Sequence, residues 1–383
     1  MDALEVRVGA LERAQSLYDL ISREAEAGER LGRLTDPVAS ALLGNQMLAI
    51  FDAPSDGGLG GSWRDFYDAV EVVARADGSA GWCVSVCNAI NHTLRLGLPA
   101  EGREEVFGSG PTSCWASLIP RATATPEAGG YRVTCPGTFG SGSSISSWVM
   151  VAANAAGAGD GRYRAFVIPK AEVEIKPGSW DVMGLRGTAS IDYTIADVFV
   201  PTRRSWEYNW TSDDASGALS ALAAARLNAI GLTAFASGVG QRALLELIAS
   251  AGKTRRTVAE GLQAEDNVVQ AGIGELDGRM KAARSHLLGL VTAAEERTRE
   301  GGVLTLQEGL ALSQACLTLG KASREMVIFA FDHAGTSAVY AHQPLQRCLR
   351  DIFTGLKHVA FTPAFLGLIG RQQLGLTSAR TVL

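Results

Sequence analysis

The chain has 383 residues, of which 46% are hydrophobic and 20% are charged, and its net charge is −5. This composition is typical of a globular protein that buries a substantial core. The Lys and Arg residues are dispersed and form no basic patch, which argues against a nucleic-acid-binding protein. The first fifteen residues lack the apolar segment of a secretory signal, and no apolar run reaches the length of a membrane span. We therefore expect a soluble, cytoplasmic protein.

Residues 1–112 are predicted to form an α-helical domain. Stretches rich in Ala, Leu, Glu and Arg are interrupted by prolines and by a glycine-rich loop at 54–61. Residues 63–76 fit an amphipathic helix, and Asp77 is expected to cap a following helix that carries residues 82–96.

Residues 113–212 are predicted to form a β domain. Five segments are β-branched or alternate between polar and apolar residues, and Gly, Pro and Ser separate them: 131–134, 148–153, 163–168, 173–175 and 191–200. Strands at this spacing, without helices between them, favour an antiparallel sandwich or barrel.

Residues 213–383 are predicted to form a four-helix bundle. Its helices are expected over 219–251, 268–299, 306–334 and 344–369. The first helix contains small residues that permit close packing against a neighbour. The predicted fold class is therefore α+β, with helical segments on both sides of a β segment.

Six cysteines occur, and none lies in a CxxC motif. Most lie in apolar segments, and their spacing does not group the ligands of a zinc site. We interpret them as small core residues in a reducing compartment and expect no metal. Neither a GxGxxG nor a GxxxxGK[ST] loop occurs, so no nucleotide-binding loop of a known type is visible.

A polar stripe near the C-terminus is the most informative local pattern. Its residues follow one another at steps of three, one, three and four, which places them on one face of a predicted helix: Arg347, Arg350, Asp351, Thr354 and His358. A solvated helix face is one interpretation. The flanking residues are mostly apolar, and the stripe ends in a histidine, whose proton moves readily near pH 7. We therefore favour a functional surface.

Four motifs in chain order are similar to those of proteins with the acyl-CoA dehydrogenase fold. They are Asp77-Gly78-Ser79-Ala80-Gly81-Trp82 followed by His92, Thr138-Phe139-Gly140-Ser141-Gly142 followed by Trp148, the run 180–190 leading to Pro201, and residues 344–351 followed by His358. More narrowly, the chain resembles the flavin-dependent monooxygenases on that fold, which are the oxygenase components of two-component systems (group D). The resemblance covers nearly the whole chain.

The resemblance implies both an activity and partners. The activity is that of an oxidoreductase that uses reduced flavin (FMNH2 or FADH2) and O2, through a flavin C4a-hydroperoxide, to hydroxylate a small aromatic or natural-product substrate. A separate NAD(P)H:flavin reductase is implied, and so is a homotetramer. No nucleic-acid or membrane partner is expected.

Two other functions stay open. An acyl-CoA dehydrogenase or oxidase needs a carboxylate base, which in the common branch lies just past the Arg-Asp helix. Residues 356–363 contain no Asp or Glu, and His358 stands there instead. Some dehydrogenases carry the base on an earlier helix. The other alternative is a flavin-free interaction protein on the same fold. The chain also departs from many of the monooxygenases, since no aromatic residue lies two residues after His92.

The glycine-flanked Ser141 is the main cofactor candidate. Its hydroxyl is expected to donate to the edge of the flavin ring, and Gly142 permits close backbone approach. Ser117 is a further candidate donor. Trp148 either flanks the ring or belongs to the core.

Four more residues are assigned to cofactor binding. Thr188 and Ser190 are expected to line the mouth of the cofactor or substrate site. Arg256 resembles the arginine that pairs with the flavin phosphate, and the adjacent Arg255 fits one register away. Arg350 belongs to the last matching motif.

Two histidines are predicted to be catalytic together with Ser141. The resemblance implies that His92 is the base that deprotonates a phenol-like substrate. It places His358 across the flavin, where the imidazole helps to form or protect the oxygen adduct.

Overall fold

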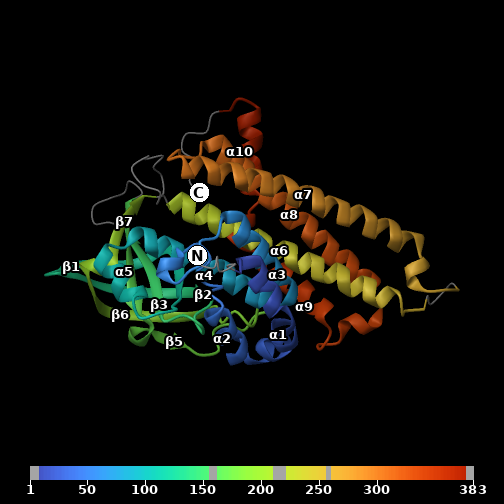
Figure 1. Ribbon diagram of the computed structural model, residues 1–383, viewed down its shortest axis with the longest axis horizontal. Coiled ribbons are helices and arrows are strands. Elements are labelled where there is room, and N and C mark those ends of the chain that lie inside the picture. Colours follow the sequence, from blue (N-terminus) through green and yellow to red (C-terminus); the bar gives the residue numbers. More distant parts are fainter. Residues whose placement is uncertain (1–7, 155–161, 210–220, 256–259, 377–383) are drawn as a thin grey trace, which may run out of the picture.

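Helices occupy both ends of the chain and strands its middle, in a computed structural model that describes residues 8–154, 162–209, 221–255 and 260–376 (Figure 1). The first helices are α1 (Ala10–Leu31), α2 (Asp36–Gly44), α3 (Trp63–Ala76), α4 (Gly78–Gly97) and α5 (Ala100–Phe107). The strands are β1 (Cys114–Glu127), β2 (Gly130–Gly140), β3 (Trp148–Asn154), β4 (Arg162–Pro169), β5 (Glu174–Lys176), β6 (Ile191–Pro201) and β7 (Ser205–Asn209). The last helices are α6 (Ala221–Ala251), α7 (Asn267–Arg299), α8 (Leu306–His333), α9 (Pro344–Gly355) and α10 (Ala364–Gln373). The predicted α+β class is confirmed.

Side-chain caps fix where α3 and α4 begin. The Ser62 hydroxyl accepts a hydrogen bond from the Asp65 backbone N–H, and the Asp65 carboxylate accepts one from the Ser62 N–H at 2.9 Å. The Asp77 carboxylate accepts from the Ala80 N–H at 2.9 Å. Because these caps satisfy N–H groups that have no partner within a helix, both predicted helices form, the second from Gly78.

The strands form one mixed sheet in the order β5-β6-β2-β1-β3-β4-β7. Residues 114–117 of β1 pair with β3 and residues 123–127 pair with β2, and the register shifts between these two parts. The β1–β3 pair is parallel, whereas β1–β2, β2–β6, β3–β4, β4–β7 and β5–β6 are antiparallel. The prediction of an antiparallel β domain is therefore wrong at β1–β3. The reason is that residues 141–147 do not form a hairpin, and instead cross from one edge of β1 to the other.

The helices and the sheet share a hydrophobic cluster. Ile90 and Leu94 of α4 pack with Met150 of β3 and Val167 of β4. Side chains from both sides of the predicted boundary at residue 112 thus share one hydrophobic cluster. The division of the chain into domains at residues 112 and 212 therefore stays a prediction.

Helix α6 is enclosed by α3, α4, α8 and α9. Small residues allow this close packing: Ala234 and Ala236 are fully buried, and a Cβ at Gly238 would collide with the backbone carbonyl of Glu71 in α3. The small residues expected on this helix thus serve packing within the chain.

A buried carboxylate joins three helices. Glu71 of α3 accepts hydrogen bonds from Ser237 Oγ of α6 at 2.6 Å and from Arg284 Nε of α7 at 2.9 Å. Asp68 also pairs with Arg284, at 2.5 Å. A buried charge is tolerated when it is paired and hydrogen-bonded, as Glu71 is.

The prediction of a single helix over 344–369 is wrong. Helix α9 ends at Gly355, a short 3-10 turn (Val359–Phe361) follows, and α10 begins at Ala364. His358 has an extended backbone, and its ring Nδ1 accepts a hydrogen bond from the Ala360 N–H at 3.2 Å, which caps the 3-10 turn. Pro363 disfavours a helical conformation for the residue before it. His358 therefore lies outside the helix that carries Arg347 and Arg350.

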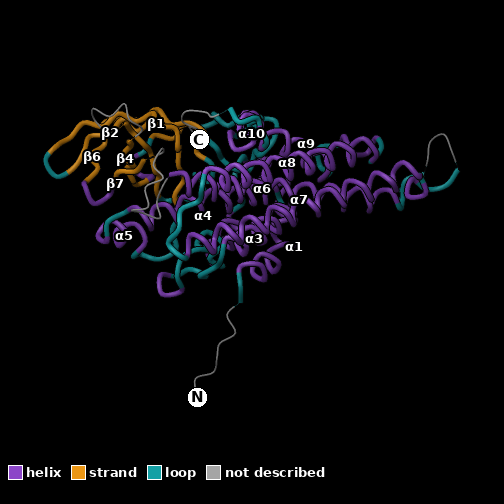
Figure 2. Tube along the Cα trace, turned by 90° about the horizontal axis from the view of Figure 1, so that it is seen from above, coloured by secondary structure: helices purple, strands orange, loops and turns teal. Residues whose placement is uncertain are grey.

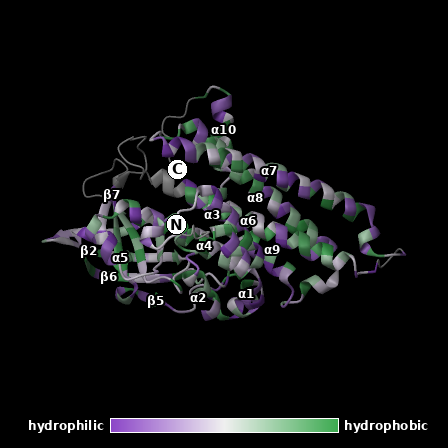
Figure 3. Ribbon diagram, in the orientation of Figure 1, coloured by the Kyte–Doolittle hydropathy of each residue, from purple (hydrophilic) through white to green (hydrophobic). Residues whose placement is uncertain are grey.

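The molecule is elongated, with the sheet at one end and α6, α7 and α8 extending away from it (Figure 2). Hydrophobic and hydrophilic residues follow one another along α7 (Figure 3). In the described ranges, no helix combines the length and the apolar character needed to cross a membrane.

Candidate active site

The turn after β2 presents Ser141 between the sheet and α4. Phe139 and Gly142 on either side of Ser141 have positive φ angles of 58° and 78°. A Cβ at Gly142 would lie 2.7 Å from the Cys87 sulfur of α4, so glycine is required here both for its conformation and for the space. Ser141 itself is half-buried.

A chain of hydroxyl groups runs inward from Ser141. Its Oγ lies 2.6 Å from Ser190 Oγ, and Ser190 Oγ lies 2.6 Å from Thr188 Oγ1. Thr188 Oγ1 donates to the Leu185 carbonyl at 2.7 Å. At the other end, Trp82 Nε1 of α4 donates to Ser141 Oγ at 3.2 Å.

Thr188 and Ser190 lie behind Ser141, not at the mouth of a site. Both are buried, with exposed fractions of 0% and 3%. The expectation that they line the mouth is therefore wrong, because the hydrogen-bonded chain draws both hydroxyls into the protein.

Asp351 of α9 fixes the loop that carries this chain. Its carboxylate accepts a hydrogen bond from the Leu185 N–H at 2.6 Å. Leu185 has a positive φ of 56°, and its carbonyl also accepts from Trp180 Nε1 at 2.9 Å. Both backbone groups of Leu185 are thereby committed, which sets the start of the hydroxyl chain.

The charged residues of the polar stripe on α9 belong to a cluster of buried and half-buried charges. Arg347 pairs with Glu29 of α1 at 3.8 Å and with Asp77 at 3.9 Å. Arg350 pairs with Glu29 and donates to the Met183 carbonyl at 2.8 Å. The stripe is therefore neither a solvated face nor one continuous functional surface. The assignment of Arg350 to the cofactor stays a prediction, since its guanidinium is already engaged here.

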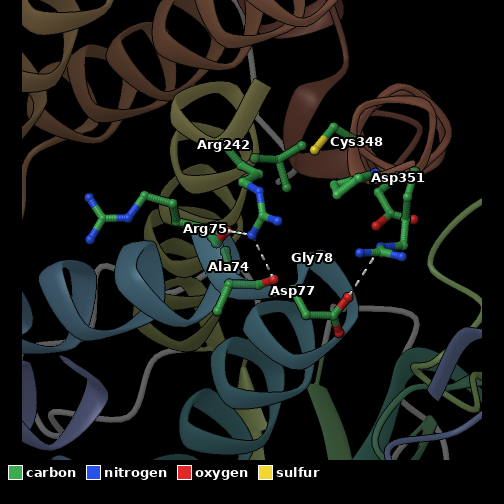
Figure 4. A pocket seen from close by; sticks show the side chains of 11 residues that line it. Ala74, Arg75, Asp77, Gly78, Arg242, Cys348 and Asp351 are labelled. Atoms are coloured by element: carbon green, nitrogen blue, oxygen red, sulfur yellow. Dashed lines mark hydrogen bonds and ion pairs between the residues drawn. The ribbon is translucent and has the colours of Figure 1, made fainter. Parts of the chain in front are cut away.

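A narrow pocket adjoins the charge cluster where α3, α4, α6 and α9 meet (Figure 4). Arg242 of α6 reaches the carbonyl of Arg75 at 3.3 Å at the end of α3. Burial raises the pKa of Asp77 above its usual range. Burial and the nearby Asp77 charge raise the pKa of Asp351 to about 7.

His358 lies beside Trp82, the residue that donates a hydrogen bond to Ser141. Its ring packs edge-on against Trp82 at 5.9 Å, and Trp82 packs in the same way on Phe235 at 5.2 Å. Burial lowers the His358 pKa from 6.5 to about 4, so the imidazole is neutral at pH 7. Because Nδ1 accepts from the Ala360 N–H, the single ring hydrogen is assigned to Nε2.

His92 occupies a more distant point of α4. It follows Trp82 by ten residues, about 15 Å along the helix axis. Its ring packs on Phe51 at 4.9 Å, and burial lowers its pKa to about 4. Asn88, one turn earlier, donates to the Met47 and Val84 carbonyls and so serves the fold.

The other predicted cofactor residues are dispersed. Trp148 starts β3 and packs against the cluster that contains Ile90 and Leu94, with the Arg204 guanidinium 5.8 Å from its ring. Ser117 pairs with Val151 through the backbone, and its side chain lies outside the described residues. Arg256 also lies outside them. The roles of these residues stay predictions.

The Ser141 turn has the character of a ring-binding surface. Phe139 and Met183 are exposed by 63% and 56%, and Phe139 packs edge-on against Trp180 at 6.2 Å. Ser141 follows Phe139 by two residues, and His358 packs on Trp82, which donates to the Ser141 hydroxyl. Apolar contacts and a few directed polar groups fit the isoalloxazine ring of a flavin.

Sequence reasoning missed two contributors to this site. Trp82 was part of a matching motif, yet its indole N–H as the donor to Ser141 became visible only in the structure. The role of Asp351 as the acceptor for Leu185 was also missed, because 166 residues separate the two.

Comparison with known proteins identifies relatives over the whole length. Residues 230–363 match the family model "Acyl-CoA dehydrogenase, C-terminal domain". The oxygenase subunit HsaA, a flavin-dependent monooxygenase of Mycobacterium tuberculosis, is 28% identical over 381 residues, covering 96% of this chain and 96% of HsaA. The oxygenase component of an FADH2-dependent resorcinol hydroxylase of a Rhizobium species is 26% identical, covering 95% of this chain and 93% of that protein.

Solved structures give the same result. The M. tuberculosis HsaA structure superposes with a TM-score of 0.86 at 27% identity, covering 98% of this chain and 99% of that one. XiaF from a Streptomyces species, in complex with FADH2 and glycerol, has a TM-score of 0.88 at 22% identity, covering 98% and 97%. The predicted acyl-CoA dehydrogenase-like fold is confirmed.

We predict that Asp351 makes stability depend on pH. Its pKa is about 7 when folded and 3.8 ordinarily, so the folded state holds an extra proton between these values, and stability falls as the pH rises from about 4 to 7. Asp351→Asn keeps an oxygen for the Leu185 N–H and cannot ionise. Its thermal unfolding midpoint should therefore fall less than that of the parent between pH 5 and 7.5. Asp181→Asn, an exposed carboxylate of the same loop, is the control and should follow the parent. Parallel curves for Asp351→Asn and the parent would contradict the prediction.

Proposed function

We propose that this chain, which is a flavin-dependent monooxygenase with the acyl-CoA dehydrogenase fold, is the oxygenase component of a two-component system and hydroxylates a small aromatic or natural-product substrate. The observation that carries this proposal is the Ser141 turn, where a half-buried hydroxyl accepts a hydrogen bond from Trp82 and the exposed Phe139 lies two residues away. The likeness to HsaA and to the resorcinol hydroxylase along almost the whole chain supports it.

The proposed reaction consumes one reduced flavin, one O2 and one substrate C–H group, and it yields oxidised flavin, a C–OH group and one water. The bound reduced flavin supplies two electrons and two hydrogens. The protein orients the reactants, excludes bulk water and holds protons on the ring nitrogens of two histidines.

His92 is proposed as the base for the substrate. Burial lowers its pKa to about 4, so the imidazole is neutral above about pH 5 and has a ring nitrogen that can accept a phenolic proton, and the same lowered pKa makes it a weaker base than an exposed histidine. Removing that proton makes the aromatic carbon more nucleophilic.

His358 is proposed to lie on the side of the flavin where O2 reacts. With Nδ1 engaged by the Ala360 N–H, it offers a neutral Nε2–H donor next to Trp82. A neutral donor can hydrogen-bond a partly negative oxygen without delivering a proton prematurely.

A diffusible NAD(P)H:flavin reductase is proposed as the supplier of reduced flavin, in the cytoplasm. The six free, buried cysteines fit a reducing compartment. A homotetramer is proposed from exposed apolar side chains near the C-terminal helices: Val268, Val359, Leu366 and Leu374. The small residues of α6 do not support it, since they pack within the chain. A monomer mass by light scattering at micromolar concentration would exclude the tetramer.

Anaerobic titration tests the function. The purified chain is titrated with FMNH2 and FADH2, and then with FMN and FAD, before an oxygen pulse with phenols and indoles as substrates. We expect saturable binding of reduced flavin and hydroxylated product. Tightly bound oxidised flavin that acyl-CoA bleaches would instead identify a dehydrogenase. No binding of either redox form would favour an interaction protein.

We predict that His92→Ala slows product formation by about a hundredfold, the usual contribution of a positioned base. The loss should shrink as the pH approaches the pKa of the substrate, because the substrate then ionises unaided. Reduced-flavin affinity should not change. His286→Ala, on the exposed side of α7, is the matched control. Product formation by His92→Ala at the parent rate would exclude the base role.

We predict that His358→Ala uncouples the reaction. Losing the Nε2–H donor should lower product per flavin oxidised severalfold and release the difference as H2O2. The measurement is a peroxide assay alongside product analysis in one oxygen pulse. His342→Ala removes an exposed imidazole from the segment before α9 and should leave coupling intact. Equal coupling in the two variants would contradict the role.

A further inference from the structure

We propose that Thr188 and Ser190 are positioning residues that fix Ser141 as a hydrogen-bond acceptor, so that the site selects reduced over oxidised flavin. The inference rests on the proposed function, because it assumes that the Ser141 turn faces the flavin ring edge. It reverses the expectation from the sequence that Ser141 donates a hydrogen bond to the ring.

The direction of the chain is set at Leu185. A carbonyl oxygen has no hydrogen to give, so at 2.7 Å the Thr188 hydroxyl must donate to the Leu185 oxygen. The single hydrogen of Thr188 is then committed. At the next link, of 2.6 Å, Ser190 must therefore donate to Thr188.

The same reasoning fixes which residue donates in the hydrogen bond between Ser141 and Ser190. The hydrogen of Ser190 is committed to Thr188, so across the 2.6 Å link Ser141 donates to Ser190. Trp82 Nε1, which can only donate, occupies one lone pair of Ser141. One lone pair remains on the half-buried Ser141 oxygen, and no hydrogen.

Burial prevents the chain from reversing. Thr188 is 0% and Ser190 3% exposed, so water cannot replace a broken link. Turning the Ser141 hydrogen outward would leave two oxygens 2.6 Å apart with no hydrogen between them. An unsatisfied buried group of this kind is costly. Asp351 helps to hold the Leu185 carbonyl, where the chain of hydroxyl hydrogen bonds begins, because it accepts a hydrogen bond from the Leu185 backbone N–H.

The remaining lone pair discriminates between flavin redox states. The ring N5 of a reduced flavin carries a hydrogen and donates, whereas the N5 of an oxidised flavin only accepts. A lone pair on Ser141 therefore makes a hydrogen bond with the reduced ring and a repulsive contact with the oxidised one. A net hydrogen bond of ordinary strength corresponds to roughly tenfold in affinity.

Two substitutions break the chain at different links. Thr188→Val removes the hydroxyl that orders the chain, and Ser190→Ala frees the Ser141 hydrogen directly. Thr188→Ser keeps a hydroxyl at the same position and is the matched control. Ser143→Ala is a second control, since Ser143 lies in the same turn and donates to the Ala189 carbonyl outside the chain.

The experiment measures the Kd of FMN and FAD in both redox states under anaerobic conditions, together with the reduction potential of the bound flavin. The parent should bind reduced flavin more tightly, and Thr188→Val and Ser190→Ala should each lower the ratio of oxidised to reduced Kd by about tenfold. Both controls should keep the parent ratio. Circular dichroism and the thermal midpoint identify a variant that fails to fold. The Kd ratio of the variant that does fold then tests the inference.

The outcomes separate the two proposals. If the parent prefers reduced flavin and the folded variants keep its ratio, the acceptor role set by Thr188 and Ser190 is wrong and the monooxygenase assignment stands. If the parent binds neither redox state, the proposed function itself fails. A parent that binds oxidised flavin more tightly would overturn the inference directly.

Discussion

The hydrogen bond from the Leu185 N–H to the Asp351 carboxylate joins two parts of the chain on which the candidate site depends. Asp351 belongs to a C-terminal helix, and Leu185 to the loop before β6. Leu185 has a left-handed backbone, which a leucine rarely adopts. The bond, together with the Trp180 donor on the carbonyl, holds that conformation and aims the carbonyl at Thr188. The Asp351 bond therefore supports the carbonyl from which the hydroxyl chain to Ser141 takes its direction.

This arrangement requires a carboxylate deep in the protein, and the charge cluster explains how it is tolerated. Arg347 and Arg350 of α9 pair with Glu29 of α1 and with Asp77, the residue that caps α4, so charges of both signs lie together in buried or half-buried positions. Paired buried charges contribute little net stability, whereas removing one partner is strongly destabilising. The cluster therefore fixes geometry more than it adds stability, which suits a support for an active site.

Strained backbone gathers around the same turn. Phe139, Leu185 and Ala189 are non-glycine residues with positive φ angles. Each such conformation costs energy and persists only when its surroundings determine it, and such residues cluster at functional sites. Here the hydrogen bonds of the hydroxyl chain, the Phe139–Trp180 contact and the packing of Gly142 on Cys87 supply those surroundings.

The sequence alone determined the α+β class and the helices over 63–76 and 82–96, because caps and hydrophobic periodicity are local signals. Its Gly-Ser-Gly turn also made Ser141 a candidate for cofactor binding, which stays a prediction. The sequence could not determine the parallel β1–β3 pair, which depends on where residues 141–147 cross. It placed His358 on a helix face, whereas the tertiary structure turns it away to cap the next turn and pack on Trp82. Nor could it show that Ser141 accepts where a donor was expected. The direction of a hydroxyl hydrogen follows from its partners, and those of Ser141 lie 59 residues before it and 49 after it. Only folding brings such residues together, and so only the tertiary structure decided what the site presents to a ligand.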